Sequence, residues 1–112
     1  GTITIASSFN PARQTLTDGS TITWNINNGE AAVVTLGNIN RTLSITNPIA
    51  GRTYIIEIIQ GTGGGKTIST WPTGTTWVGG TPTLSSLEGQ VDVVSLYYNG
   101  TNYRGVFNGP FA

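Results

Sequence analysis

The C-terminal part of the chain contains the run Val91-Asp-Val-Val-Ser-Leu-Tyr97-Tyr98, which is followed at once by Asn99-Gly100-Thr101-Asn102-Tyr103. Both runs are rich in β-branched and aromatic residues, and an Asn-Gly pair stands between them. A type I′ turn needs a positive φ at both central positions, which Asn and Gly tolerate best. We therefore predict that strands Val91–Tyr98 and Asn102–Phe107 form an antiparallel hairpin.

Two earlier segments show the patterns of buried strands. Thr21–Ile26 alternates strictly, which places Ile22, Trp24 and Ile26 on one face and polar residues on the other. Tyr54–Ile59 is nearly continuous in apolar residues, which is typical of a strand covered on both faces. We predict that this second segment is the central strand of the core.

Turn residues divide the rest of the chain into further short strands. Gly61–Gly65 and the segment 72–83, which contains Pro72 and Pro82, are expected to be loops because proline cannot donate to a ladder. Evenly spaced strands of this kind predict one all-β domain over residues 1–112, an antiparallel, jelly-roll-like β-sandwich of seven to eight short strands. The other predicted strands are Thr2–Ala6, Glu30–Leu36, Arg41–Thr46, Arg52–Gln60 and Lys66–Trp71.

The composition excludes several classes of partner. Charged residues make up 9% of the chain, against about 25% in typical soluble domains, and nineteen threonines and ten asparagines supply the polarity instead. The net charge is zero and no basic cluster exists, so we expect no nucleic-acid partner. No run approaches the roughly twenty apolar residues of a membrane helix.

The chain contains no methionine, and we expect it to be a fragment or processed piece of a longer protein.

A glycine-rich segment resembles a phosphate-binding loop without meeting its requirements. The segment ends in Gly65-Lys66-Thr67, but the phosphate-binding pattern needs a glycine where Gln60 stands. It also needs a following helix, whereas Ile68-Ser69-Thr70 favours a strand. We interpret the segment as a flexible hairpin loop.

The residues that usually carry catalysis or bind metals are scarce. The chain has no histidine and no cysteine, and its five carboxylates are spaced singly. We therefore predict no catalytic residues, no metal site and no cofactor, and we expect that the protein is not an enzyme. A glycan-cleaving pair of carboxylates stays open as a third class, because sequence spacing does not exclude it. The carboxylates are Asp18, Glu30, Glu57, Glu88 and Asp92.

The aromatic residues admit two interpretations. Trp24 and Tyr54 are expected to point into the core, because strand alternation directs them inward. The aromatic residues near the 72–83 loop and the Asn-Gly turn could equally pack at an interface or stack on sugar rings, with asparagines hydrogen-bonding the hydroxyl groups. The candidate ligand-binding residues are Trp71, Trp77, Tyr98, Asn99, Asn102 and Tyr103.

Several short elements gain meaning from their order. Thr15-Leu16-Thr17-Asp18-Gly19 is followed by Asn40-Arg41-Thr42, then by Trp71-Pro72, Trp77-Val78-Gly79-Gly80 and finally Tyr98-Asn99-Gly100-Thr101. In order and spacing these elements resemble a small domain of tailed-bacteriophage virion proteins, of the tail-fibre, tail-spike and head-decoration kinds. The resemblance covers about residues 14–107. The chain departs from these proteins at one position. In them the second tryptophan is often followed by Pro-Gly-Gly, whereas here Trp77 is followed by Val78-Gly79-Gly80.

The resemblance implies a virion location and a structural role. It implies an all-β, commonly trimeric module on the tail or the capsid exterior, with other virion proteins as partners. Strand edges with few charged residues independently favour closure by another subunit, so we predict a homotrimer. The alternative is a carbohydrate-binding module that recognises host surface polysaccharide through exposed Trp and Tyr loops.

Overall fold

A computed structural model describes residues 13–111 of the chain, so the predicted strand Thr2–Ala6 lies outside the described residues. The described part is all-β, as predicted, and its only helical segment is a single 3-10 turn at Ile26–Asn28. Glu30–Leu36 and Lys66–Trp71 were predicted within one or two residues of the observed strands, whereas β1 and β7 were not predicted. The nine strands described are β1 (Arg13–Thr15), β2 (Thr21–Asn25), β3 (Ala31–Leu36), β4 (Arg41–Thr46), β5 (Arg52–Gln60), β6 (Ile68–Thr70), β7 (Thr75–Trp77), β8 (Val91–Tyr98) and β9 (Tyr103–Phe111).

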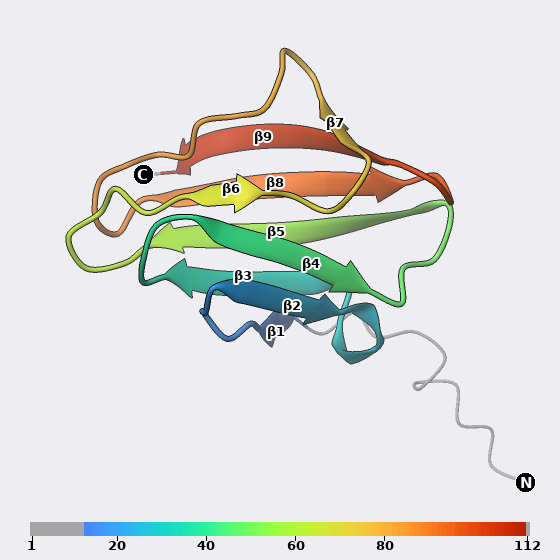
Figure 1. Ribbon diagram of the computed structural model, residues 1–112, viewed down its shortest axis with the longest axis horizontal. Coiled ribbons are helices and arrows are strands. Elements are labelled where there is room, and N and C mark those ends of the chain that lie inside the picture. The colour runs from blue at the N-terminus through green and yellow to red at the C-terminus, as the bar shows by residue number, and fades with distance from the viewer. Residues whose placement is uncertain (1–12, 112) are drawn as a thin grey trace, which may run out of the picture.

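The strands form two sheets that lie one over the other (Figure 1). The large sheet has the order β1-β3-β5-β8-β9-β7, and the small sheet has the order β2-β4-β6. From β1 to β6 the chain alternates between the sheets, and each strand lies parallel to the one before it in the same sheet. This coiling is the stacking of a solenoid, in which each turn of the chain covers the last.

The predicted antiparallel, jelly-roll-like arrangement is therefore not the one that residues 13–111 adopt. Antiparallel pairing occurs only between β5 and β8 and between β8 and β9. The short connections from β2 to β3 and from β4 to β5 carry the chain into the other sheet instead of back along the same one. Gly29 and Gly51 have φ angles of 149° and 88° in these connections, and Asn47 has a φ of 60°. The sequence predicted the positions of these turns correctly. It did not predict that each turn leads into the other sheet.

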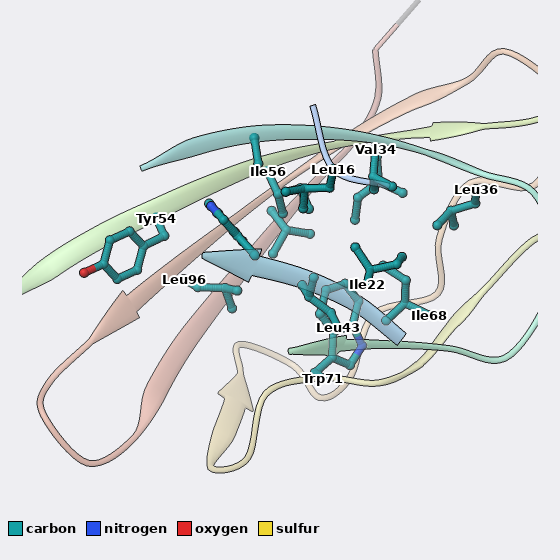
Figure 2. Close-up of a cluster of buried hydrophobic side chains, with 14 of the residues drawn as sticks. Leu16, Ile22, Val34, Leu36, Leu43, Tyr54, Ile56, Ile68, Trp71 and Leu96 are labelled. Carbon is teal, nitrogen blue, oxygen red and sulfur yellow. The ribbon is translucent and has the colours of Figure 1, made fainter. Parts of the chain in front are cut away.

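Side chains from both sheets meet in one core (Figure 2). Ile22 and Trp24 of β2 are fully buried and Ile26 is nearly so, as the alternation predicted. Trp24 donates from Nε1 to the carbonyl oxygen of Gly29 at 3.0 Å, and its ring meets that of Tyr54 edge-on at 6.1 Å. This hydrogen bond therefore links the core to the connection that leads from β2 to β3.

The strand β5 is central, as predicted, but it is not covered on both faces. It lies third in the six-stranded order, between β3 and β8. Tyr54, Ile56 and Ile58 are buried, while Ile55 on the opposite face is 44% exposed. Within residues 13–111 the prediction of two covered faces is not met, because the small sheet packs against one face of the large sheet and no described element covers the other.

The hairpin of β8 and β9 is antiparallel, as predicted, but its turn differs from the predicted one. Tyr98 pairs with Tyr103, so four residues form the connection. Gly100 has a φ of 102°, whereas Asn99 is not among the residues with a positive φ. The Asn99 side chain instead accepts hydrogen bonds from the backbone N–H groups of Thr101 and Asn102 at 2.9 and 2.7 Å. The type I′ turn is therefore replaced by a wider turn that the Asn99 side chain closes.

The glycine-rich segment connects the two sheets and is not a hairpin loop. It carries the chain from β5 in the large sheet to β6 in the small one. The buried side chain of Gln60 accepts from the N–H of Lys66 at 2.9 Å and donates to its carbonyl oxygen at 2.6 Å. Gly63 N–H donates to Glu88, and Gly65 N–H to the carbonyl of Ser86. The segment is thus held at both ends and along its length.

The buried carboxylate of Asp92 ties the 78–90 segment to β8. Its two oxygens accept from the backbone N–H and the hydroxyl of Ser85, at 2.7 and 2.6 Å. We expect Asp92→Asn to lower the free energy of unfolding by about 1.5–3 kcal/mol, because a charge-assisted bond is lost and one Ser85 donor loses its acceptor. Urea denaturation measures this change. Glu57→Gln is the control, because its exposed pair with Arg13 should contribute about 0–1 kcal/mol; equal effects of the two variants would contradict the prediction.

Candidate groove beside β4

The main candidate site is a groove along one edge of β4. β2 pairs with β4 from Thr42 to Thr46, whereas the pairing of β6 with β4 ends at Thr42 and Thr70. Pro72 follows shortly after and cannot donate to a ladder. The C-terminal half of β4 therefore has one edge without a strand partner among the described residues.

The direction of the backbone groups on β4 follows from its hydrogen bonds. The N–H of Thr42 donates toward β2, to Ser20, and the N–H of Arg41 donates toward β6, to Thr67. Successive residues of a strand direct their backbone groups to opposite sides. The N–H and C=O groups of Ile45 therefore face the side that β6 has left.

This edge and the chain after β6 enclose a pocket of about 290 Å³. Its walls combine aromatic and apolar surface with four serine and threonine hydroxyl groups, and no charged side chain lines it. Figure 2 shows Trp71, which lines this pocket, next to Leu43 at the margin of the core. The lining residues are Thr42, Leu43, Ser44, Ile45, Thr70, Trp71, Pro72, Thr73 and Tyr103.

Two of the predicted ligand-binding aromatic residues meet at this groove, but as buried residues. Trp71 and Tyr103 are 9% and 5% exposed and belong to the core cluster. Trp77 is partly buried and packs edge-on against Trp71, with ring centroids 4.8 Å apart and an interplanar angle of 71°. The backbone of Gly105 packs so closely under the Trp77 ring that a Cβ there would clash with it. These rings therefore do not form the exposed platform that the carbohydrate-binding alternative assumed.

The other three predicted residues surround the turn between β8 and β9. The Tyr98 ring lies against that of Tyr103 with centroids 4.7 Å apart, and its hydroxyl donates to the carbonyl of Gly100 at 2.9 Å. The Asn99 side-chain oxygen is engaged in closing the turn. Asn102 packs beside Gly74, where an added Cβ would meet its side chain at 2.7 Å. The role of Asn99 and Asn102 beside a ligand stays a prediction, and the Asn99 oxygen would have to leave the turn to take part.

The phenol of Tyr103 has a shifted ionisation. Burial away from water raises the pKa of Tyr103 from 10.0 to about 12, with smaller contributions from Tyr98 and Tyr54. Below about pH 10 the folded and unfolded chains hold the same proton, and above it the unfolded chain ionises first. We therefore expect the free energy of unfolding to fall between about pH 10 and 12.

Alkaline titration followed by tyrosinate absorbance tests this expectation. One step should appear near pH 12, and Tyr103→Phe should remove it. If the absorbance change near pH 12 is the same in both proteins, the assignment to Tyr103 is wrong.

The carboxylates of the chain are held apart by separate partners. Asp18 binds Arg41 through two hydrogen bonds of 3.0 and 2.6 Å, and burial of this pair is partial. The bond to Asp18 raises the pKa of Arg41 above its ordinary value. Among residues 13–111, no group of three or more acidic, histidine or cysteine residues is placed to hold a metal ion. The other acidic contacts are Glu30 with Arg52, Glu57 with Arg13, Glu88 with Gly63 and Asp92 with Ser85.

Sequence reasoning did not identify the hydroxyl residues of the groove. The alternation in Arg41–Thr46 places Thr42 and Ser44 on the outward face, and this signal was available. The contribution of Thr70 and Thr73 depends on where β6 ends, which no local pattern specifies.

The buried Nε1 of Trp71 has no hydrogen-bond acceptor among the described residues. Leaving a buried donor unpaired costs about 1–3 kcal/mol.

The comparisons with known proteins found no relative that could help to interpret the groove. Neither protein-family models, nor curated proteins, nor solved structures gave a significant match. In the part of the chain that the structure describes, there is no helix with the length and apolar character to span a membrane.

Proposed function

We propose that this chain is a non-enzymatic structural module of a bacteriophage virion, which assembles as a homotrimer and contacts other virion proteins. The module serves as a fibre or spike tip, or as a decoration of the capsid exterior. The order of the short sequence elements supports the virion assignment. One structural observation supports the assembly, and it is the uncovered face of the large sheet.

The outer face of the large sheet carries a group of exposed apolar residues and has no layer packed over it within residues 13–111. It is the face turned away from the small sheet in Figure 1. Ile55, Tyr97 and Val106 are 44%, 42% and 45% exposed on it. Ile55 and Val106 share a row, because each pairs with Ser95. The apolar residues of this face are Ile55, Ile59, Val91, Val93, Tyr97, Val106 and Phe111, and Arg13, Glu57 and Arg104 are its charged residues.

A contiguous apolar surface of this kind marks an interaction site more often than a free surface. A second copy of the chain suits it, because two of the three charges on the face, Arg13 and Glu57, pair with each other and the chain as a whole is neutral. That the assembly contains three subunits is inferred from the resemblance to trimeric virion modules. Closure of the sheet edges supports assembly less well, because β1 and β7 are edge strands of three residues each, and short edge strands resist lateral pairing.

The oligomeric state in solution tests this proposal directly. Native mass measurement and light scattering at micromolar concentration should both give the mass of three chains. A stable monomer under these conditions would remove the trimer. Labelling of virus particles with an antibody against this domain, followed by electron microscopy, tests the virion location.

The alternative function is carbohydrate binding, and the groove beside β4 favours it. Aromatic walls together with free hydroxyl groups are typical of sites for sugars. Binding to host polysaccharide is expected to be weak at one site and to be strengthened by three linked copies. Adsorption of the trimer to host cells, with and without soluble polysaccharide as competitor, tests this function. A glycan-cleaving enzyme is the third class, and it requires release of reducing ends from the polysaccharide.

A further inference from the structure

We infer that the groove beside β4 binds one neutral sugar ring, a site that rests on the carbohydrate-binding alternative. The site differs from the exposed aromatic loops that the sequence suggested. It is a strand edge faced by two buried aromatic side chains, and its polar groups come from the small sheet and the segment after β6.

The size and walls of the groove fit a single ring. A pocket of about 290 Å³ lies at the lower end of the range for small-molecule sites. Trp71, Pro72 and Tyr103 supply apolar wall on one side. The C–H face of a sugar packs against such surface, while its hydroxyl groups stay available for hydrogen bonds.

The polar groups of the groove match a ligand that carries many hydroxyl groups. A hydroxyl side chain can both donate and accept, and none of the four serine and threonine hydroxyls of the lining takes part in a hydrogen bond among residues 13–111. The backbone N–H and C=O of Ile45 add one donor and one acceptor at the unpaired edge. The hydroxyls belong to Thr42, Ser44, Thr70 and Thr73.

The absence of charge in the lining selects the class of sugar. No acidic or basic side chain lines the groove, and the nearby Arg41 is engaged with Asp18. Moving a carboxylate into such a site without a cation is costly. We therefore expect neutral pyranoses to bind and uronic acids to be rejected.

Titration of the ¹⁵N-labelled trimer with sugars tests the inference. The probes are the methyl glycosides of glucose, galactose, mannose and N-acetylglucosamine, with glucuronic acid as the charged comparison. At least one neutral glycoside should cause saturable shifts at millimolar concentration, confined to the amides of residues 42–46, 70–74 and 103. No shift with any of the four, equal binding of glucuronic acid, or shifts confined to other residues would overturn the inference.

Matched variants separate binding from folding. Ser44→Ala and Thr73→Val remove groove hydroxyls, and each should weaken binding about 2- to 10-fold, as the loss of one neutral hydrogen bond does. Ser86→Ala and Thr81→Val make the same changes at exposed positions of the loop after β7, away from the groove and the outer face, and should leave binding unchanged. Equal effects in both sets would also overturn the site. A trimer without sugar binding would remove this inference alone, whereas a monomer that binds sugar would remove only the proposed assembly.

Discussion

Replacement of Trp24 by alanine is expected to lower the free energy of unfolding by about 3–5 kcal/mol, the usual cost of emptying a large aromatic site in a core. Trp24 is fully buried and packs edge-on against Tyr54. It also donates to the carbonyl oxygen of Gly29, which accepts from Gln14 as well. Because whole domains are stable by only about 5–15 kcal/mol, the variant should be largely unfolded at moderate urea concentrations.

Urea denaturation followed by circular dichroism measures this loss. Leu87→Ala is the control, because Leu87 is an exposed loop residue and its truncation should change the free energy of unfolding by about 0.5 kcal/mol or less. A midpoint for Trp24→Ala that matches the wild-type midpoint would show that the core does not depend on this ring.

Introduction of a charge on the outer face should dissociate the proposed trimer. Val106→Asp places a carboxylate on β9, directly beside Ser95 of β8 and in the same row as Ile55. In a symmetric assembly the charge is buried once per subunit, and each burial without a cation costs several kcal/mol. We expect native mass measurement to show the mass of one chain in place of three.

The fold of the variant should survive, because Val106 is half-exposed and points away from the core. An unchanged far-ultraviolet circular dichroism spectrum checks this. Val78→Asp is the matched control, since Val78 is 85% exposed in the loop after β7, outside the outer face, and should leave the trimer intact. If Val106→Asp stays trimeric, the copies associate through another surface.

The prediction of the fold succeeded where a local pattern determines burial. In β2 the alternation of Ile22 and Trp24 with threonines identified the core face. The run Tyr54–Ile59 predicted a strand covered on both faces, and the described residues cover only one of them. A continuous apolar run indicates two apolar faces, but whether a second layer covers both depends on the rest of the molecule. Here one of the two faces is the surface that we assign to the trimer.

The predicted ligand-binding residues stay a prediction, and the structure brings only some of them together. Trp71 and Tyr103 were identified because of their type and position, and they do lie together at the groove. Their burial could not be foreseen, since it depends on the small sheet covering them. The unpaired edge of β4 arises because β6 stops at Thr70. Thr70 lies 25 residues after Ile45 in the chain, in a neighbouring strand of the same sheet.

The amino-acid sequence by itself determined that this protein is built of short strands, which residues of β2 face inward, and that β8 and β9 form a hairpin. These features depend on side-chain alternation and on turn residues, which act over a few positions. The tertiary structure alone decided the parallel coiling of β1 to β6, the uncovered outer face and the groove beside β4. Backbone hydrogen bonds are the same for every strand partner, so the choice among partners is made only when the layers pack together.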